Sequence, residues 1–164
     1  MKNFDWTQFT RKIAVQAPIQ KIYDAWTKPI ELERWFLSKA EFYTSEKEKI
    51  EKKQSIKEGL SYGWQWYLYP VTEHGKVTKA NGKDFLQFTF AGDCLVDVSF
   101  ETFKNGTIVS LTQKNIPTDD ENKVNVRLGC DNGWSFDLVN LKSVYEGGLD
   151  LRNKDPELKP MLNN

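Results

Sequence analysis

The stretch that decides the fold is residues 131–152, DNGWSFDLVNLKSVYEGGLDLR. Apolar residues recur in it every three or four positions and therefore lie on one face of a predicted helix. These residues are Trp134, Leu138, Leu141, Tyr145 and Leu149. Asp131 or Asn132 is the expected N-cap, and Gly147-Gly148 lies near the expected end. Because the chain before this helix is almost entirely strand-like, its apolar face predicts a curved sheet as partner, with a pocket between them.

Length and composition limit the class of protein. A chain of 164 residues predicts one domain, with a core at about residues 8–152 and a tail at residues 153–164. Lys plus Arg and Asp plus Glu both total 23, so the net charge is zero and a nucleic-acid partner is disfavoured. No segment approaches the roughly 20 apolar residues of a membrane span, and the start lacks a secretory signal. Cys94 and Cys130 are too few for a disulfide framework. We therefore expect a soluble, cytoplasmic protein, while the oligomeric state stays open.

The chain before the closing helix predicts one strand, two short helices and then an antiparallel sheet. Residues 9–16 alternate in polarity, as a half-buried strand does. Pro18 and Pro29 each stand at the start of a short amphipathic helix, where the missing N–H of proline costs nothing. Residues 64–69 and 86–90 alternate as strands with aromatic rows, and Asn81-Gly82 and Asn105-Gly106 predict hairpin turns. This order of elements predicts an α+β fold.

Three polar or short segments are harder to assign. Residues 44–57, a mixed-charge run, predict an exposed helix or a mobile loop in which Glu48 and Lys52 pair. Residues 124–128 predict a short strand or an extended link. The tail at residues 153–164 predicts a loose terminus or a strap along the surface.

No catalytic or metal motif is recognisable. His74, the one histidine, predicts an exposed loop residue, because no orienting partner or nucleophile can be placed beside it. Residues 119–121, DDE, lack the alternating ligands of a calcium loop and predict a solvated turn. Phosphate-binding loops, nucleophile elbows and paired Cys/His sets are absent from the sequence. We therefore assign no catalytic residue, metal or cofactor.

Aromatic residues make up 13% of the chain, six of them tryptophan, and they carry the positive signal. Aromatic stripes at structural periods ordinarily pack a core, and a ligand pocket is the alternative. The residues expected to line a cavity are Trp26, Trp35, Phe36, Trp64, Trp66, Phe88, Phe90, Trp134, Leu138, Leu141 and Tyr145.

Several short motifs resemble a known family. Gly133-Trp134, residues 140–142 (NLK), 146–148 (EGG) and 150–152 (DLR) together resemble the closing helix of the domain called activator of heat shock protein 90 ATPase homologue. Upstream, the resemblance continues in Ala17-Pro18, residues 25–27 (AWT), 33–36 (ERWF) and 105–107 (NGT), so that it covers nearly the whole chain.

That family belongs to the START-like superfamily, also called SRPBCC or Bet v 1-like. The resemblance implies a helix-grip fold, in which a curved antiparallel sheet wraps around a long C-terminal helix, with two short helices after strand one and an apolar cavity. Residues 44–57 depart from the pattern, because relatives usually have a glycine-bearing hairpin there.

The resemblance implies three functions. The leading hypothesis is binding of a small apolar or amphipathic molecule, lipid-like ligands included, through an opening near Trp35, Phe36 and the end of the last helix. A chaperone-interaction module that modulates a heat shock protein 90-type ATPase is the alternative. An enzyme acting on a hydrophobic substrate is the third, and a buried carboxylate with a raised pKa in the cavity would favour it.

Overall fold

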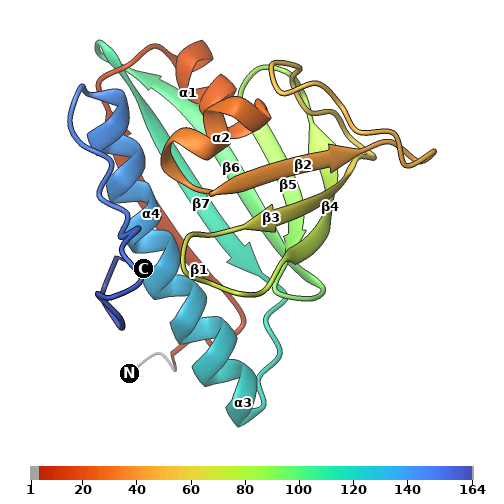
Figure 1. The fold of residues 1–164 in the computed structure, drawn as a ribbon, viewed down its shortest axis with the longest axis vertical. Helices are drawn as coiled ribbons and strands as arrows, with labels where there is room; N and C mark the ends of the chain where they lie inside the picture. Colours follow the sequence, from red (N-terminus) through yellow and green to blue (C-terminus); the bar gives the residue numbers. More distant parts are fainter. Residues whose placement is uncertain (1–3, 164) are drawn as a thin grey trace.

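The computed structural model describes residues 4–163 as a curved antiparallel sheet that wraps around one long helix (Figure 1). The sheet order is β1-β7-β6-β5-β4-β3-β2, and all adjacent pairs are antiparallel. The strands are β1 (Phe9–Val15), β2 (Lys39–Tyr43), β3 (Ser61–Gln65), β4 (Glu73–Ala80), β5 (Phe85–Phe90), β6 (Cys94–Phe103) and β7 (Gly106–Lys114). The helices are α1 (Ile19–Thr27), α2 (Pro29–Trp35), α3 (Asp120–Asn122), the π-helix η1 (Lys123–Leu128) and α4 (Gly129–Tyr145). The predicted α+β helix-grip fold is confirmed.

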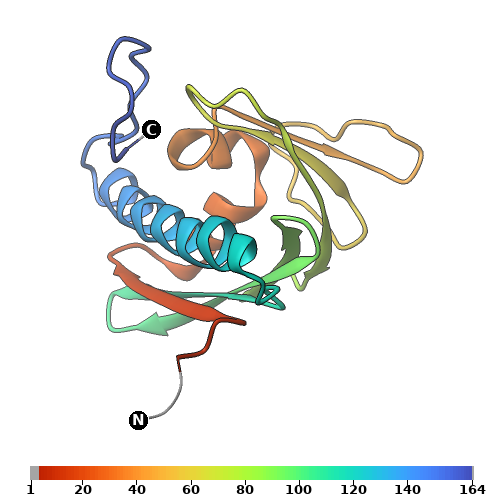
Figure 2. The same ribbon diagram turned by 90° about the horizontal axis from the view of Figure 1, so that it is seen from below.

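The concave side of the sheet holds the core. Figure 2 shows α4 crossing that side with α1 and α2 beside it, while the strands curve around the three helices. Inward residues of the sheet and the apolar face of α4 meet in one cluster, in which Val96, Leu111 and Leu141 are fully buried. No helix within residues 4–163 has the length and apolar content needed to cross a membrane.

Both predicted hairpin turns are confirmed. Gly82 has a φ of 73° between β4 and β5, and the Asn81 side-chain oxygen accepts hydrogen bonds from the three backbone N–H groups that follow Gly82. Between β6 and β7, Phe103 pairs with Gly106. A Cβ atom at Gly106 would lie 2.5 Å from the Val15 carbonyl oxygen, so β1 requires glycine there. These turns join neighbouring antiparallel strands of the sheet.

The two short helices begin and end where the prolines predict. Pro18 precedes α1, and Pro29 is the first residue of α2. The Trp35 indole N–H of α2 donates to the Ala25 carbonyl of α1 at 2.9 Å, which joins the pair. Trp26 and Trp35 are both buried, and the helix pair lies beside α4 on the concave side of the sheet (Figure 2).

The closing helix differs from its predicted bounds at both ends. Helical structure begins at residue 120, where Asp119 is the N-cap and its side chain accepts from the Asn122 N–H at 3.0 Å. Residues 124–128 are therefore helical rather than extended. Neither N-cap candidate caps the helix, and Asp131 instead forms ion pairs with Arg11 at 2.7 Å and Arg127 at 2.8 Å. At the other end α4 stops at Tyr145, and Leu149 is 78% exposed, so the buried stripe is shorter than predicted.

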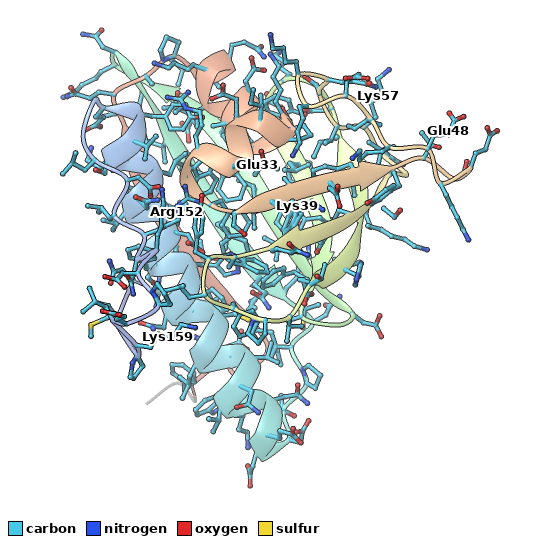
Figure 3. The ribbon with its side chains drawn as sticks, in the orientation of Figure 1. Glu33, Lys39, Glu48, Lys57, Arg152 and Lys159 are labelled. Atoms are coloured by element: carbon cyan, nitrogen blue, oxygen red, sulfur yellow. The ribbon has the colours of Figure 1, made fainter. Side chains whose placement is uncertain are left out.

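Residues 44–60 form an extended loop and not a helix. The loop begins with an isolated pairing of Tyr43 with Lys49, and one of its own residues, Ile56, is buried in the core. The expected pair of Glu48 and Lys52 does not form, because Lys52 contacts Glu33 of α2 instead. Figure 3 shows Glu48 at the tip of the loop, far from Glu33.

Candidate functional site

A pocket of about 520 Å³ lies between the first half of α4 and the end of the sheet where β3, β4 and β5 meet. One wall comes from Asn125 of η1 and from residues between 129 and 137 of α4, and the facing wall comes from residues 66–69, Glu73, Phe90 and Ala91. Leu162 from the tail stands at the rim, where it is 80% exposed. The tail therefore contributes to the lining of the pocket.

Within residues 4–163, seven aromatic residues line the pocket. Four of the seven form a connected set of ring contacts that we call the aromatic floor: Phe36, Trp66, Phe90 and Trp134. The other three are Tyr67, Tyr69 and Phe136. Trp134 is central, because its ring centroid lies 5.1 Å from that of Phe36 and 5.1 Å from that of Phe90. Its indole N–H donates to the Gln113 side-chain oxygen at 2.9 Å, so its one polar atom is satisfied inside the core. Trp66 and Phe90 keep partial exposure, which leaves apolar surface for a bound molecule.

The structure divides the predicted cavity residues into two groups. The four residues of the aromatic floor line the pocket. The others are buried in the packed core and are not among the lining residues: Trp26, Trp35, Trp64, Phe88, Leu138, Leu141 and Tyr145. The rings of these core residues contact one another directly. The ring centroids of Trp26 and Trp35 lie 4.8 Å apart, and those of Trp64 and Phe88 lie 5.2 Å apart. The opening expected near Trp35 and the end of α4 is therefore closed by packing.

The tail follows the strap alternative and covers the loop that carries part of the pocket. Lys159 donates to the Leu68 carbonyl at 3.0 Å, and Lys154 lies 4.9 Å from the centre of the Tyr67 ring. Leu68 has a φ of 61°, a left-handed conformation that is uncommon for a residue other than glycine. The rim of the pocket is thus built from two segments that are far apart in sequence.

Arg152 anchors the strap at its origin. Its side chain is 6% exposed and contacts Asp150 through two hydrogen bonds of 2.8 Å, one from Nε and one from an Nη atom. It also donates to the carbonyls of Leu37 and Glu33, at 2.8 and 3.0 Å (Figure 3). Burial would raise the pKa of Asp150, but hydrogen bonds from Arg152 and Lys154 outweigh it and lower that pKa. The DLR motif therefore ties the strap to α2.

The polar groups of the pocket were not predicted from the sequence. They are Glu73, Asn125, Cys130, Asn132 and Asp137. Burial raises the pKa of the Cys130 thiol to about 11, so this cysteine is protonated near neutral pH and is a poor nucleophile. His74 is an exposed residue of β4 and not of a loop, and it does not line the pocket.

Asp137 is the most informative of these groups. It follows Trp134 by three residues on α4, and its side chain is partly buried at the pocket wall. Desolvation raises its pKa well above the ordinary value, and the charge of Arg152 offsets this only in part. In the sequence, Asp137 stands next to Leu138 of the apolar stripe, which was the available sign of a carboxyl group near the pocket. The same pattern fits an acidic residue on the solvent-exposed face of a helix, so it does not identify a pocket residue.

Asp137→Asn is expected to raise the stability of the protein near neutral pH by about 1–2 kcal/mol, because it removes a desolvated charge. Since the folded-state pKa is raised, the unfolded chain loses this proton first, near the ordinary value of 3.8. Stability is therefore lost as the pH rises from that value through the folded-state pKa, and the variant should escape this loss.

Thermal unfolding of both proteins between about pH 4 and pH 8 measures this effect. Glu101→Gln is the control, because it removes one negative charge, as Asp137→Asn does, but at an exposed position of β6. A variant that is less stable than the parent at every pH would contradict the assignment of an unpaired, desolvated Asp137.

The fold and pocket define a helix-grip protein of the START-like class, also called SRPBCC. The chain belongs to the family described as activator of Hsp90 ATPase homolog 1-like protein, which matches residues 16–146. The comparison with curated proteins gave no match.

Solved structures share the fold. A protein from Staphylococcus saprophyticus is 18% identical, with a TM-score of 0.68 over 88% of this chain and 96% of that chain. The Aha1 dimer from Colwellia psychrerythraea is 21% identical, with a TM-score of 0.65 over 86% and 97%. A protein of the dynemicin biosynthetic locus is 16% identical, with a TM-score of 0.68 over 90% of this chain and 50% of that chain. At these identities the likeness concerns the fold alone.

Proposed function

We propose that this protein binds an apolar or amphipathic small molecule in the pocket between α4 and the β3–β4 loop. The observation that carries the proposal is a cavity of about 520 Å³ with an aromatic floor and a few polar groups on its walls. Binding sites for small molecules typically measure about 300–1,000 Å³ and combine an apolar lining with a small number of convergent polar groups. The pocket has both properties.

The proposal is tested by titrating the purified protein with a panel of lipids, sterols and aromatic metabolites. Trp66 and Trp134 line the pocket, so binding should change tryptophan fluorescence. A ligand at about 100 times its Kd should stabilise the folded state by about 2.7 kcal/mol and raise the melting temperature. Unchanged fluorescence and melting temperature across the panel would contradict the proposal. Stimulation of an Hsp90-type ATPase without any ligand effect would instead favour the chaperone module suggested by the family name.

Gly133→Leu should block the pocket without unfolding the protein. A Cβ atom at Gly133 meets no heavy atom within 4 Å, and the residue lines the pocket from α4. Replacing a helical glycine by leucine should stabilise α4 by up to about 1 kcal/mol, since leucine is the better helix former. We expect affinity for any ligand found in the panel to fall at least about tenfold, or 1.4 kcal/mol.

Isothermal calorimetry on Gly133→Leu and on Val139→Leu measures this effect. Val139 lies on the same helix, is 51% exposed and does not line the pocket, so its variant should bind as the parent does. Undiminished binding by a folded Gly133→Leu protein would place the ligand elsewhere.

Asp137 also favours a second candidate, an enzyme acting on a hydrophobic substrate. A carboxyl group with a raised pKa keeps its proton to a higher pH than an ordinary carboxyl group does, and in a pocket it can act as a general acid. Incubating each bound compound with the protein and measuring its mass tests this candidate. Turnover that disappears in Asp137→Asn supports it, and recovery of every compound unchanged excludes it for the panel used.

A further inference from the structure

The charged side chains that line the pocket are both acidic. Asp137 comes from the helix wall and Glu73 from the start of β4 on the sheet wall. Among the lining residues, all of which belong to the described range 4–163, no lysine, arginine or histidine is present. An anionic ligand would therefore meet two carboxyl groups and no compensating cation, and like charges placed together disfavour binding.

The carboxyl group of Asp137 is compensated by the protein itself only in part. It accepts no hydrogen bond and forms no ion pair within residues 4–163, and the basic group that acts on it is Arg152. Arg152 forms an ion pair with Asp150 and donates hydrogen bonds to two backbone carbonyls. These contacts neutralise most of its charge, so little attraction remains for Asp137. The Oε1 atom of Glu73 accepts a hydrogen bond from the Ala91 N–H at 2.8 Å. The other side-chain oxygen of Glu73 does not take part in that hydrogen bond. Both acidic groups thus retain capacity for a donor in the pocket.

We infer that the pocket recognises an amphipathic amine, whose protonated nitrogen pairs with Asp137 while its apolar body lies on the aromatic floor. This inference rests on the proposed function, because it names the charge of the molecule that the pocket binds. A positive nitrogen offsets the cost of a desolvated carboxylate, which a neutral ligand does less well. Aromatic rings add to this preference, since their faces attract cations and not anions.

The basic groups near the rim do not reverse this charge pattern. Lys154 is paired with Asp150 at 2.9 Å. Lys159 donates to the Leu68 carbonyl at 3.0 Å on the strap. Neither side chain lines the pocket, so an amine can reach the aromatic floor without contacting either of them.

Calorimetric titration with decylamine, decanol and decanoate, each below its micellar concentration, tests the inference. These probes share one alkyl chain and differ in charge at neutral pH. We expect decylamine to bind at least about tenfold more tightly than decanol, because a tenfold change in Kd corresponds to about 1.4 kcal/mol, and a close ion pair can supply this energy. We expect decanoate to bind more weakly than either probe, because its carboxylate meets two acidic groups. Naphthylethylamine, naphthylethanol and naphthylacetate repeat the comparison with an aromatic body.

Variants separate recognition in the pocket from general attraction of cations. Asp137→Asn should reduce the preference for decylamine over decanol to within about threefold, with decanol binding unchanged. Glu73→Gln, which can still accept the Ala91 N–H, provides a second variant with a smaller loss. Glu101→Gln removes one exposed carboxylate outside the pocket and should change nothing. Gly133→Leu should weaken all three probes together.

The outcomes are distinguishable. Decanol binding without a preference for decylamine, or decanoate binding as tightly as decylamine, would overturn the inference and leave the proposed function standing. A preference for decylamine that survives in both Asp137→Asn and Glu73→Gln would also overturn it. Absence of binding by all probes, both aliphatic and aromatic, would overturn the inference together with the proposed function.

Discussion

Trp134→Ala is expected to lower the free energy of unfolding by about 3–5 kcal/mol, as large-to-small substitutions of buried aromatic residues do. Trp134 is 2% exposed, and its ring lies within 6.2 Å, centroid to centroid, of the rings of Trp26, Phe36, Phe88 and Phe90. Its removal leaves a void at the junction of helix and sheet. It also leaves the buried Gln113 side-chain oxygen without its donor.

Denaturant unfolding monitored by circular dichroism measures this loss, with an unchanged m-value as evidence that the folded state stays compact. Trp134→Phe keeps a ring but loses the hydrogen bond to Gln113, so an intermediate loss of about 1–2 kcal/mol is expected. Tyr69→Ala is the exposed control, since Tyr69 is 60% exposed and its truncation should cost less than about 1 kcal/mol. A loss below about 1 kcal/mol for Trp134→Ala would contradict the central position of this ring.

Arg152→Ala is expected to destabilise the protein by about 2–3 kcal/mol, below the usual range for a broken buried pair because Asp150 stays partly exposed. The substitution removes the donors to Asp150 and to the Leu37 and Glu33 carbonyls. Since Arg152 joins the strap to α2, limited proteolysis should cut residues 153–163 faster in the variant. Lys154→Ala is the control, because Lys154 is 49% exposed and its pair should contribute less than about 1 kcal/mol.

The pH dependence of this variant follows from the lowered pKa of Asp150. Stabilisation by Asp150 is present above its ordinary pKa of 3.8 and is lost as the pH falls through the lowered folded-state pKa. Arg152→Ala should remove most of this acid-limb dependence, so parent and variant should converge in stability as the pH is lowered. A constant difference between them at all pH values would contradict an ionic origin of the effect.

Local sequence patterns predicted the elements whose signals lie within a few residues. The turn at Asn81-Gly82, the proline-started helices and the stripe through Trp134 and Tyr145 depend on neighbouring residues, and the structure has all of them. Local patterns were not sufficient where a distant partner decides the outcome. Residues 44–57 allowed an exposed helix or a loop, and the structure has the loop, in which Ile56 is buried in the core. Lys52 contacts Glu33 of α2 and not the expected Glu48.

The helix start is a second case of this kind. Asp131 resembles an N-cap in sequence, but Arg11 of β1 pairs with it and Asp119 caps the helix twelve residues earlier. Leu149 continues the helical spacing, yet the helix has ended at Tyr145 and Leu149 is exposed. The spacing of apolar residues alone does not show where a helix ends or where its packing against the sheet stops.

By itself, the sequence determined the order of elements, the apolar faces and the family, because periods of two and of 3.6 residues and short motifs are local properties. Tertiary structure alone decided which rings fill the core and which line a pocket. That division depends on how closely α4 approaches each strand and on where the strap lies, since the same ring either meets another ring or faces an opening. It also placed Asp137 and Glu73 on facing walls, because α4 and β4 meet only in the folded chain.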